Sequence, residues 1–378
     1  MRRSGRWRHS GRGVAIVGLL AVLAVGCTVG PAANRAARMG PVEPTDDGGG
    51  PSGENGDPSG LPTGDPSSPP VQENPAPADA SGSVDSTQNT PDMDNLCCFV
   101  ELPDGDLLVG EQDTGVVSRI DDSGNVSPVG TIPRIAQADN GALLGLAIEP
   151  DFDGEDDWLY VYFADSSDNR IGRYPYTPDD PPGQQLGAYP DTFVTDIPKS
   201  AGGGPLAFGP DGMLYAGTGD EVLRMDSSGS PPPDNPDPAS AVYASGFTDV
   251  EGLALDPVGR LWVVDAAGNG TVVHVVSRDA QDGTVAPPME AWQAPPGEAQ
   301  APTGLAYGED SRSLWLTTAT DQGVWRIPLD GEGGVVAEPE LLEGDGIAGV
   351  VDIAPTVTAG DRLLTLDTSG RMLTLAVT

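Results

Sequence analysis

Few residues of this chain other than its carboxylates could carry out chemistry. The 378 residues include 57 acidic side chains, but two histidines, His9 and His274, and three cysteines. Carboxylates in such number could recruit a divalent cation, or they could simply keep the protein dissolved and monomeric, which we favour. The formal net charge of -38 argues against nucleic acid or an anionic membrane surface as a partner of the folded part.

The cysteines are Cys27, Cys97 and Cys98. If Cys27 is acylated, as argued below, the two adjacent cysteines can pair only with each other or stay reduced. A disulfide between neighbours closes a very small ring, so it would be a geometric or redox feature and would not staple a long loop. We favour the simpler interpretation, in which both are small buried residues that open the first strand of the folded domain.

The N-terminus has the order of a secretory signal. Five arginines precede Gly13, and an apolar run from Val14 to Val25 follows, which is too short to span a membrane. Leu23–Cys27 resembles the bacterial lipobox, so residues 1–26 are predicted to be a lipoprotein signal peptide and Cys27 the lipidated residue. The alternative is an ordinary signal peptide. The expected location is the outer face of the cytoplasmic membrane or the cell envelope, by either the Sec or the twin-arginine route.

Residues 27–94 have the composition of a tether. The segment is rich in Pro, Gly, Asp, Ser and Asn, and it lacks aromatic residues. Such a segment cannot bury enough apolar surface to offset the entropy lost on ordering. We therefore predict a disordered, lipid-anchored linker that ends at residue 94 and holds a domain away from the membrane.

From residue 95 to residue 378 one phrase recurs: an apolar strand, a turn of the Pro-Asp-Gly kind, a second strand, a polar gap and a third strand. The six copies begin at Phe99, Leu146, Leu206, Gly252, Gly304 and Val350. One small sheet cannot bury both of its faces, whereas sheets packed radially bury each other. The repeat predicts an all-β fold, a six-bladed β-propeller, with no helical segment. The tryptophans on the expected strands, at 158, 262, 315 and 325, should pack between blades.

Two segments resemble a known family. Leu143–Phe152 is similar to the "LLGLAxHPDF" phrase of the soluble glucose/sorbosone dehydrogenases, and 203–220 is similar to their "GGRLAFGPDGxLYVxTGD". The resemblance covers about 280 residues. It implies a six-bladed propeller that, in active members, uses pyrroloquinoline quinone (PQQ) and Ca²⁺ to oxidise sugars.

The same resemblance exposes two losses. The family histidine that takes the hydroxyl proton matches Ala201, and the arginine that helps to hold the quinone matches Thr248, followed by Asp249. We therefore expect a non-oxidising relative, with no cofactor assigned, that binds a small molecule or a protein at the propeller mouth. The first alternative is an active PQQ-dependent sugar dehydrogenase. The second is a metal-dependent lactonase-like hydrolase, which Glu251–Ala254 and Pro302–Ala306 also resemble.

The resemblance places several polar residues at or near the mouth, on loops that connect strands. These candidate site residues are Asn140, Asp220, Asp249, Glu251 and Asp265. Each could equally be an ordinary turn residue. His274 is expected to be structural because it lies within a fourth-blade strand.

Overall fold

The computed structural model describes residues 75–77, 82–89, 93, 95–153, 157–199, 204–268, 270–279, 283–321, 323–343, 347, 349–356, 362–367 and 369–377. The predicted signal peptide, Cys27 and most of the predicted tether therefore lie outside the described residues. Ala201 lies outside them as well.

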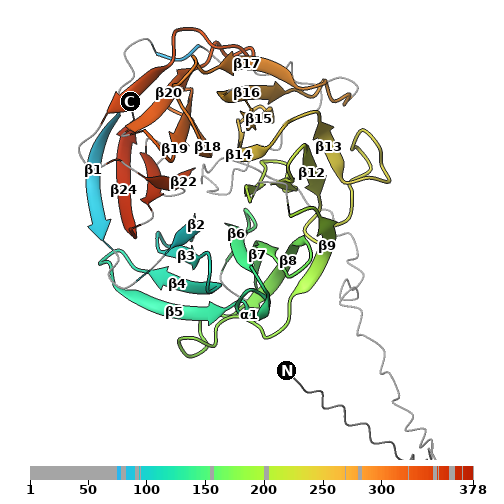
Figure 1. Ribbon diagram of the computed structural model, residues 1–378, viewed down its shortest axis with the longest axis vertical. Helices are drawn as coiled ribbons and strands as arrows, with labels where there is room; N and C mark the ends of the chain where they lie inside the picture. Colours follow the sequence, from blue (N-terminus) through green and yellow to red (C-terminus); the bar gives the residue numbers. More distant parts are fainter. Residues whose placement is uncertain are drawn as a thin grey trace, which may run out of the picture. The chain divides into compact units, whose positions relative to one another are not determined.

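The described strands form six four-stranded antiparallel sheets, arranged as blades around a common centre (Figure 1). In each of the first five blades the chain starts at the centre and moves outward, one strand at a time, before it crosses to the next blade. This confirms the predicted all-β, six-bladed propeller. Radial packing gives every sheet a neighbour on both faces, which no single antiparallel sheet has.

The strands of the first three blades are β2 (Leu96–Glu101), β3 (Leu107–Glu111), β4 (Val116–Ile120) and β5 (Val126–Thr131); β6 (Ala142–Ala147), β7 (Asp157–Ala164), β8 (Asn169–Tyr176) and β9 (Asp191–Ile197); β10 (Leu206–Phe208), β11 (Leu214–Gly217), β12 (Glu221–Met225) and β13 (Val242–Ser245). Blades 4 to 6 contain β14 (Val250–Leu255), β15 (Leu261–Ala267), β16 (Gly270–Val276) and β17 (Met289–Gln293); β18 (Pro302–Gly308), β19 (Ser313–Thr318), β20 (Gly323–Pro328) and β21 (Glu340–Glu343); β22 (Val350–Pro355), β23 (Arg362–Asp367), β24 (Arg371–Val377) and β1 (Gly82–Asn89).

The outermost strand of blade 6 comes from the other end of the chain. β1 pairs antiparallel with β24, from Gly82 opposite Val377 to Asn89 opposite Arg371. The prediction that residues 82–89 belong to the tether is therefore wrong. Their polar, low-hydrophobicity composition resembles that of a linker, but an outer strand needs little more than a backbone that can hydrogen-bond to its neighbour, and Val84 supplies an apolar contact.

The first hairpin of a blade is turned by residues suited to that geometry. In blade 3, Asp211 accepts a hydrogen bond from the Met213 N–H at 3.1 Å, and Gly212 has a φ of +72°. Glycine adopts this left-handed conformation without steric cost, and Asp stabilises the turn with its side chain. Gly105 and Gly259 hold the same place in blades 1 and 4.

The hydrophobic core lies between neighbouring blades. In the described part of the chain, each of six buried clusters joins residues of two successive sheets. Trp262, Trp315 and Trp325 are buried in these clusters, which confirms their predicted inter-blade role. Trp158 is partly buried between blades 2 and 3, with the guanidinium of Arg173 above its ring.

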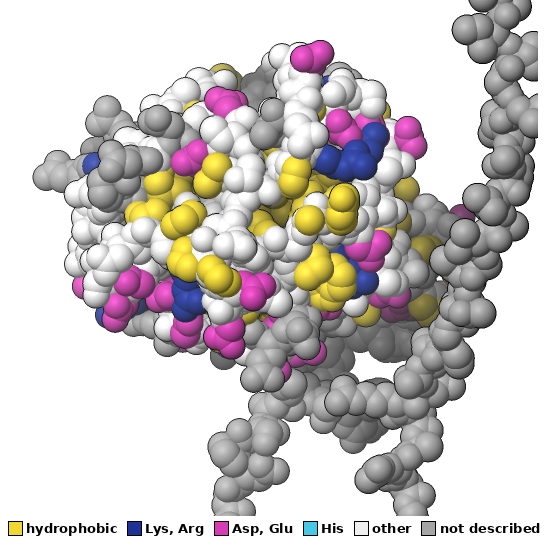
Figure 2. All heavy atoms as spheres, turned by 90° about the horizontal axis from the view of Figure 1, so that it is seen from below, with side chains coloured by type: hydrophobic (Ala, Val, Ile, Leu, Met, Phe, Trp, Pro, Cys, Tyr) yellow, Lys and Arg dark blue, Asp and Glu magenta, His cyan; other side chains and the backbone are white. Residues whose placement is uncertain are grey.

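One short helix breaks the all-strand pattern among the described residues. α1 (Pro133–Gln137) lies between β5 and β6, where no helix was predicted, because five residues are too few to show a helical period. No helix in the described ranges is long and apolar enough to cross a membrane. Figure 2 views the propeller from below Figure 1, and acidic side chains are spread over this face with fewer basic ones and small apolar patches between them.

Candidate functional site

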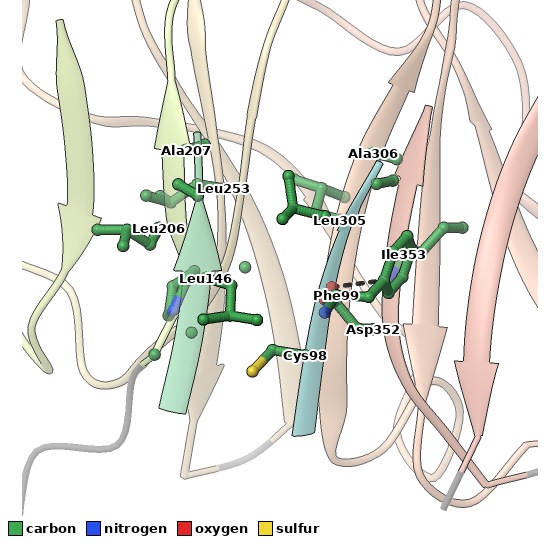
Figure 3. Close-up of a pocket in the computed structure, with 18 of the residues that line it drawn as sticks. Cys98, Phe99, Leu146, Leu206, Ala207, Leu253, Leu305, Ala306, Asp352 and Ile353 are labelled. Atoms are coloured by element: carbon green, nitrogen blue, oxygen red, sulfur yellow. Dashed lines mark hydrogen bonds between the residues drawn. The ribbon is translucent and has the colours of Figure 1, made fainter. Parts of the chain in front are cut away.

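The central channel encloses a cavity of about 890 Å³. Its wall is built from the innermost strand of each blade, and these six strands carry the same short phrase in register (Figure 3). One layer of the wall consists of a large apolar residue from every blade: Phe99, Leu146, Leu206, Leu253, Leu305 and Ile353. A layer of small residues, mostly alanine, follows. The middle of the channel is therefore apolar, and polar side chains can gather only toward its ends.

The entrance of the channel, as we use the term, is the end where the inner strands begin. Five of the six inner strands have an irregular register there, with one extra residue that has no partner on the neighbouring strand. The extra residues are Cys97, Leu144, Glu251, Thr303 and Val351. Such bulges re-aim the side chain they carry, and all five residues line the cavity.

The residue after each bulge faces the next blade closely. A Cβ on Gly252 would lie 2.9 Å from the Leu305 backbone nitrogen, and one on Gly304 would lie 3.2 Å from the Ile353 nitrogen. Glycine is needed where two inner strands approach so closely. This explains why the phrase carries glycine in blades 2, 4 and 5.

Blade 6 has Asp352 at the position of these glycines. Its carboxylate accepts hydrogen bonds from the backbone N–H of Phe99, at 3.1 Å, and of Ile353, at 2.8 Å (Figure 3). The first bond joins blade 6 to blade 1, where the ring closes. Burial raises the pKa of Asp352 to about 7, although both hydrogen bonds favour the charged form. Asp352 was not among the residues predicted from the sequence, although its place in the repeated phrase distinguishes it.

Two of the predicted site residues form a carboxyl pair at the entrance. Glu251 lines the cavity, and its side chain is hydrogen-bonded to that of Asp249. Burial raises the pKa of Glu251, and the charge and hydrogen bond of Asp249 raise it further, to about 7. Two carboxyl groups in contact share one proton more readily than they carry two negative charges.

Asp265 supports this pair from behind. It accepts backbone hydrogen bonds from Thr248, at 2.9 Å, and from Asp249, at 2.7 Å, and the Nε2 atom of His274 lies 3.6 Å from it. Burial opposes the charge of Asp265, but the nearby His274 ring and the hydrogen bonds from the backbone N–H groups of Asp249 and Thr248 outweigh it and lower the pKa of Asp265. The ring of His274 packs edge-on against Phe247. His274 and Asp265 therefore hold the 247–250 loop in place, a structural role for the histidine.

Of the five predicted residues only Glu251 lines the cavity, and Asp220 and Asn140 also lie apart from the Asp249–Glu251–Asp265 group. The backbone carbonyl of Asp220 accepts hydrogen bonds from Gly246 and Phe247, while its side chain is exposed. Asn140 is an exposed loop residue with a φ of +58°, and its carbonyl accepts a hydrogen bond from Lys199. The structure thus joins Asp249, Glu251 and Asp265 and leaves Asp220 and Asn140 apart from them.

Cys97 and Cys98 form a disulfide at the entrance, on the first strand of blade 1. Cys98 is buried, Cys97 is half-buried, and both line the cavity. The disulfide occupies a tight space, because a Cβ on Gly110 would lie 3.2 Å from the Cys98 sulfur. The favoured interpretation was correct in placing the cysteines at the start of the first inner strand. The favoured interpretation did not include the disulfide between Cys97 and Cys98.

The described residues of the wall do not fit a tricarboxylate quinone. None of them is Lys, Arg or His, and Thr248 and Pro205 stand where the resemblance requires arginine. The acidic lining residues are Glu101, Glu149, Glu251 and Asp352. Such a wall repels an anion. Within the described ranges, no three His, Cys, Asp or Glu side chains converge as metal ligands would.

Known proteins share both the sequence pattern and the fold. Residues 94–272 match the family described as Glucose / Sorbosone dehydrogenase. The structure is similar to the PQQ-bound aldose sugar dehydrogenase of Streptomyces coelicolor, with 32% identity, a TM-score of 0.69, and coverage of 80% of this chain and 100% of that chain.

Two more distant relatives agree with this likeness. A putative glucose dehydrogenase of Thermus thermophilus has 20% identity and a TM-score of 0.60, and the match covers 78% of this chain and 99% of that chain. An uncharacterised protein of Synechocystis is 24% identical over 327 residues, which cover 66% of this chain and 76% of the relative. The fold is the same in the Thermus structure at this low identity.

Proposed function

This chain belongs to the glucose/sorbosone dehydrogenase family, and from that premise we propose that it is a non-oxidising member that binds its ligand in the central channel. The observation that carries the proposal is the composition of the wall. The described lining has four carboxyl residues and no cationic side chain. The enzyme chemistry needs a base to take a proton and cations to hold an anionic cofactor, and the matching residues are Ala201 and Thr248.

The wall retains what a binding site needs. A cavity of about 890 Å³ with an apolar middle and a few polar groups toward its ends is typical of small-molecule sites. None of the described buried clusters between blades contains Thr248, so the propeller does not depend on an arginine at that position. Its proposed ligand is a small molecule, and a protein segment inserted at the mouth is the other form of the same proposal.

An active PQQ-dependent sugar dehydrogenase is the alternative, and one observation favours it. The Streptomyces coelicolor protein, whose structure holds PQQ, is 32% identical over its whole length. An active site without the usual arginine and histidine would then have to use Glu251 or Asp249 as the base.

Dye reduction decides between the two. The purified chain is given PQQ and Ca²⁺ and a panel of aldoses, with the Streptomyces coelicolor protein as the positive control. We expect no sugar-dependent reduction by the chain. The double variant Ala201→His, Thr248→Arg tests the cause, because it should gain quinone binding, seen as quinone absorbance that stays with the protein through gel filtration. Sugar-dependent turnover by the unmodified chain would refute the proposal.

We also propose that the domain works at the cell envelope, as a monomer held to a membrane by a lipid on Cys27. The arginine-rich start, the short apolar run and the following cysteine support this. The acidic surface supports a role without nucleic acid, because the protein surface and a nucleic acid both carry negative charge and would repel each other.

A further inference from the structure

The inner strands of the blades present free backbone edges to the channel. Among the described strands, the innermost strand of each blade is paired on one side only, and its other edge lies toward the middle of the ring (Figure 1). Along such a strand, residues whose N–H and C=O bond the neighbouring strand alternate with residues whose N–H and C=O point away from it. Every second residue of an inner strand therefore directs its backbone groups toward the channel.

The register identifies these residues on β18 of blade 5. Ala301 belongs to the paired set, because its carbonyl accepts a hydrogen bond from the Ala319 N–H at 2.9 Å. The alternation continues through the bulge at Thr303 and Gly304, so Leu305 belongs to the set that points away from β19. The N–H of Leu305 is therefore on the channel edge.

Strand β14 of blade 4 repeats this arrangement. The Asp249 carbonyl accepts a hydrogen bond from the Ala266 N–H at 2.8 Å, and the bulge at Glu251 and Gly252 follows. Leu253 then takes the same position as Leu305. Because blades 4 and 5 are neighbours, two backbone donors lie at one level on adjacent inner strands.

The seam between blades 6 and 1 shows what such a pair of donors binds. Ile353 and Phe99 are the equivalents of Leu253 and Leu305, and their N–H groups donate to the Asp352 carboxylate, at 2.8 and 3.1 Å (Figure 3). One carboxyl group thus bridges the backbone donors of two neighbouring blades. Donors at this level of the channel therefore accommodate oxygen acceptors between blades.

Between blades 4 and 5 the protein does not supply that acceptor from the same position. Gly252 stands in the place of Asp352, and a Cβ on it would lie 2.9 Å from the Leu305 nitrogen. A glycine has no side chain that could accept a hydrogen bond. A backbone N–H that faces an apolar cavity without an acceptor costs free energy comparable to a lost hydrogen bond. A ligand that brings an oxygen acceptor from the channel side would recover this free energy.

The rest of the cavity wall selects the kind of acceptor. None of the described lining residues is Lys, Arg or His, and Glu251 and Asp352 are among its carboxyl residues, so an anionic acceptor is repelled. The two N–H groups lie in the layer of large apolar residues, which suits an apolar body. A neutral carbonyl oxygen on an apolar molecule meets both conditions.

The donor side chains of the wall lie closer to the entrance and are partly engaged. They belong to Asn95, Gln112 and Thr303. The Asn95 amide donates to the Gln112 side chain at 3.2 Å, and the Thr303 hydroxyl donates to the Val350 carbonyl at 2.8 Å. These bonds hold the entrance together, and the backbone donors lie further along the inner strands.

We propose that the channel binds neutral carbonyl compounds with an apolar body, such as ketones, esters and amides, through the backbone N–H groups of Leu253 and Leu305. The apolar body packs against the layer of large apolar residues. This assignment rests on the proposed ligand-binding function and names the ligand class. Asp352 occupies the corresponding place at the seam, so the ligand uses blades 4 and 5.

The test uses titration calorimetry of the full chain with three probes of matched size: 4-phenylbutan-2-one, 3-phenylpropanoate and 4-phenylbutan-2-ammonium. The ketone should bind at least about tenfold more tightly than the carboxylate, because the acidic wall repels the anion. The ammonium probe has no acceptor for the backbone donors, so it should bind more weakly than the ketone.

Leu305→Pro removes one of the two donors. The ladder between β18 and β19 does not use this N–H, and proline is tolerated at such edge positions; Pro355 holds one on β22. Leu305→Ala is the matched control, because it also loses the leucine side chain but keeps the N–H. Leu305→Pro should weaken ketone binding about fivefold more than Leu305→Ala, as loss of one neutral hydrogen bond implies.

The carbonyl ¹³C chemical shift of labelled ketone gives a second measurement that needs no variant. Hydrogen-bond donors deshield a carbonyl carbon, so the bound ketone should resonate downfield of the same ketone in cyclohexane. The signal should move upfield in the complex with Leu305→Pro and stay in place with Leu305→Ala. If Leu305→Pro does not fold, Leu253→Pro and Leu253→Ala form the replacement pair.

Four results would overturn the assignment. They are equal weakening by the proline and alanine variants, a bound ¹³C shift equal to that in cyclohexane, binding of either charged probe as tight as that of the ketone, and no binding of the ketone. The first two would leave ligand binding in the channel standing without the backbone donors. Failure of the proposed function is measured separately, as sugar turnover in the dye assay.

Discussion

Asp352 shows how one residue can depart from a repeated phrase and acquire a role. The equivalent residues of blades 2, 4 and 5 are glycines, which let two inner strands approach each other. Asp352 instead accepts a hydrogen bond through its carboxylate from the backbone N–H of Phe99 in the next blade. The bond lies between the last blade and the first. Its strength depends on protonation, because burial holds the pKa of this carboxyl near 7.

Replacement of Asp352 by Asn should change how stability depends on pH. The raised pKa means that the folded state binds more protons than the unfolded state between about pH 4 and pH 7, so the free energy of unfolding falls as pH rises through this window. An amide keeps an acceptor oxygen and cannot ionise. When the pH is raised from 5 to 8, the free energy of unfolding should fall less for Asp352→Asn than for the unmodified chain. The difference between the two decreases should be roughly 1–3 kcal/mol.

Urea unfolding at the two pH values measures the difference. The exposed Asp310→Asn, on blade 5, is the control for loss of one negative charge. If both variants respond to pH as the unmodified chain does, Asp352 is not the group responsible.

At the scale of elements, the close approach of inner strands sets what the channel wall tolerates. A Cβ on Gly145 would overlap the backbone carbonyl oxygen of Gly204 on the next blade, and a backbone atom cannot move aside without disturbing the strand. Gly145→Ala should therefore lower the free energy of unfolding by about 1–3 kcal/mol. Gly268→Ala should cost little, because nothing lies within 4 Å of its added Cβ. Chemical denaturation of both variants checks this, and equal losses would contradict it.

Strand β1 makes a second prediction at this scale. It covers the outer edge of β24 and closes the sheet of blade 6, so its removal leaves a row of unpaired backbone groups exposed. A chain that begins at residue 95 should melt at a lower temperature and associate more readily than a chain that begins at residue 75. Thermal unfolding and gel filtration report the two effects. Equal melting temperatures would mean that β1 does not contribute to closure.

At the scale of the whole molecule, the proposed anchor decides where the channel works. Because an acylated Cys27 would become the first residue of the mature protein, Cys27→Ala should move the domain from the membrane fraction to the soluble envelope fraction. The mass of the N-terminal peptide should fall by the mass of the acyl chains. An unmodified Cys27 in the membrane-bound protein would refute the lipid anchor and leave the propeller assignment untouched.

The repeated phrase alone was enough to predict the propeller and its six blades, because alternating strands and turns are local properties that each copy restates. The same holds for the tryptophans, which belong to strands whose faces must be buried. The strand at 82–89 escaped prediction because its pairing with 371–377 joins opposite ends of the chain, and its own composition gives no sign of it.

The site divides in the same way. The family resemblance predicted the loss of the base at Ala201 and of the arginine at Thr248, and it named Asp249, Glu251 and Asp265 together with Asp220 and Asn140. Only the tertiary structure separated the first three from the other two, paired Asp249 with Glu251, and set the disulfide across the channel from them. The reason is physical: residue types and spacing are written along the chain, whereas burial, shared protons and the facing of blades arise only when the ring closes.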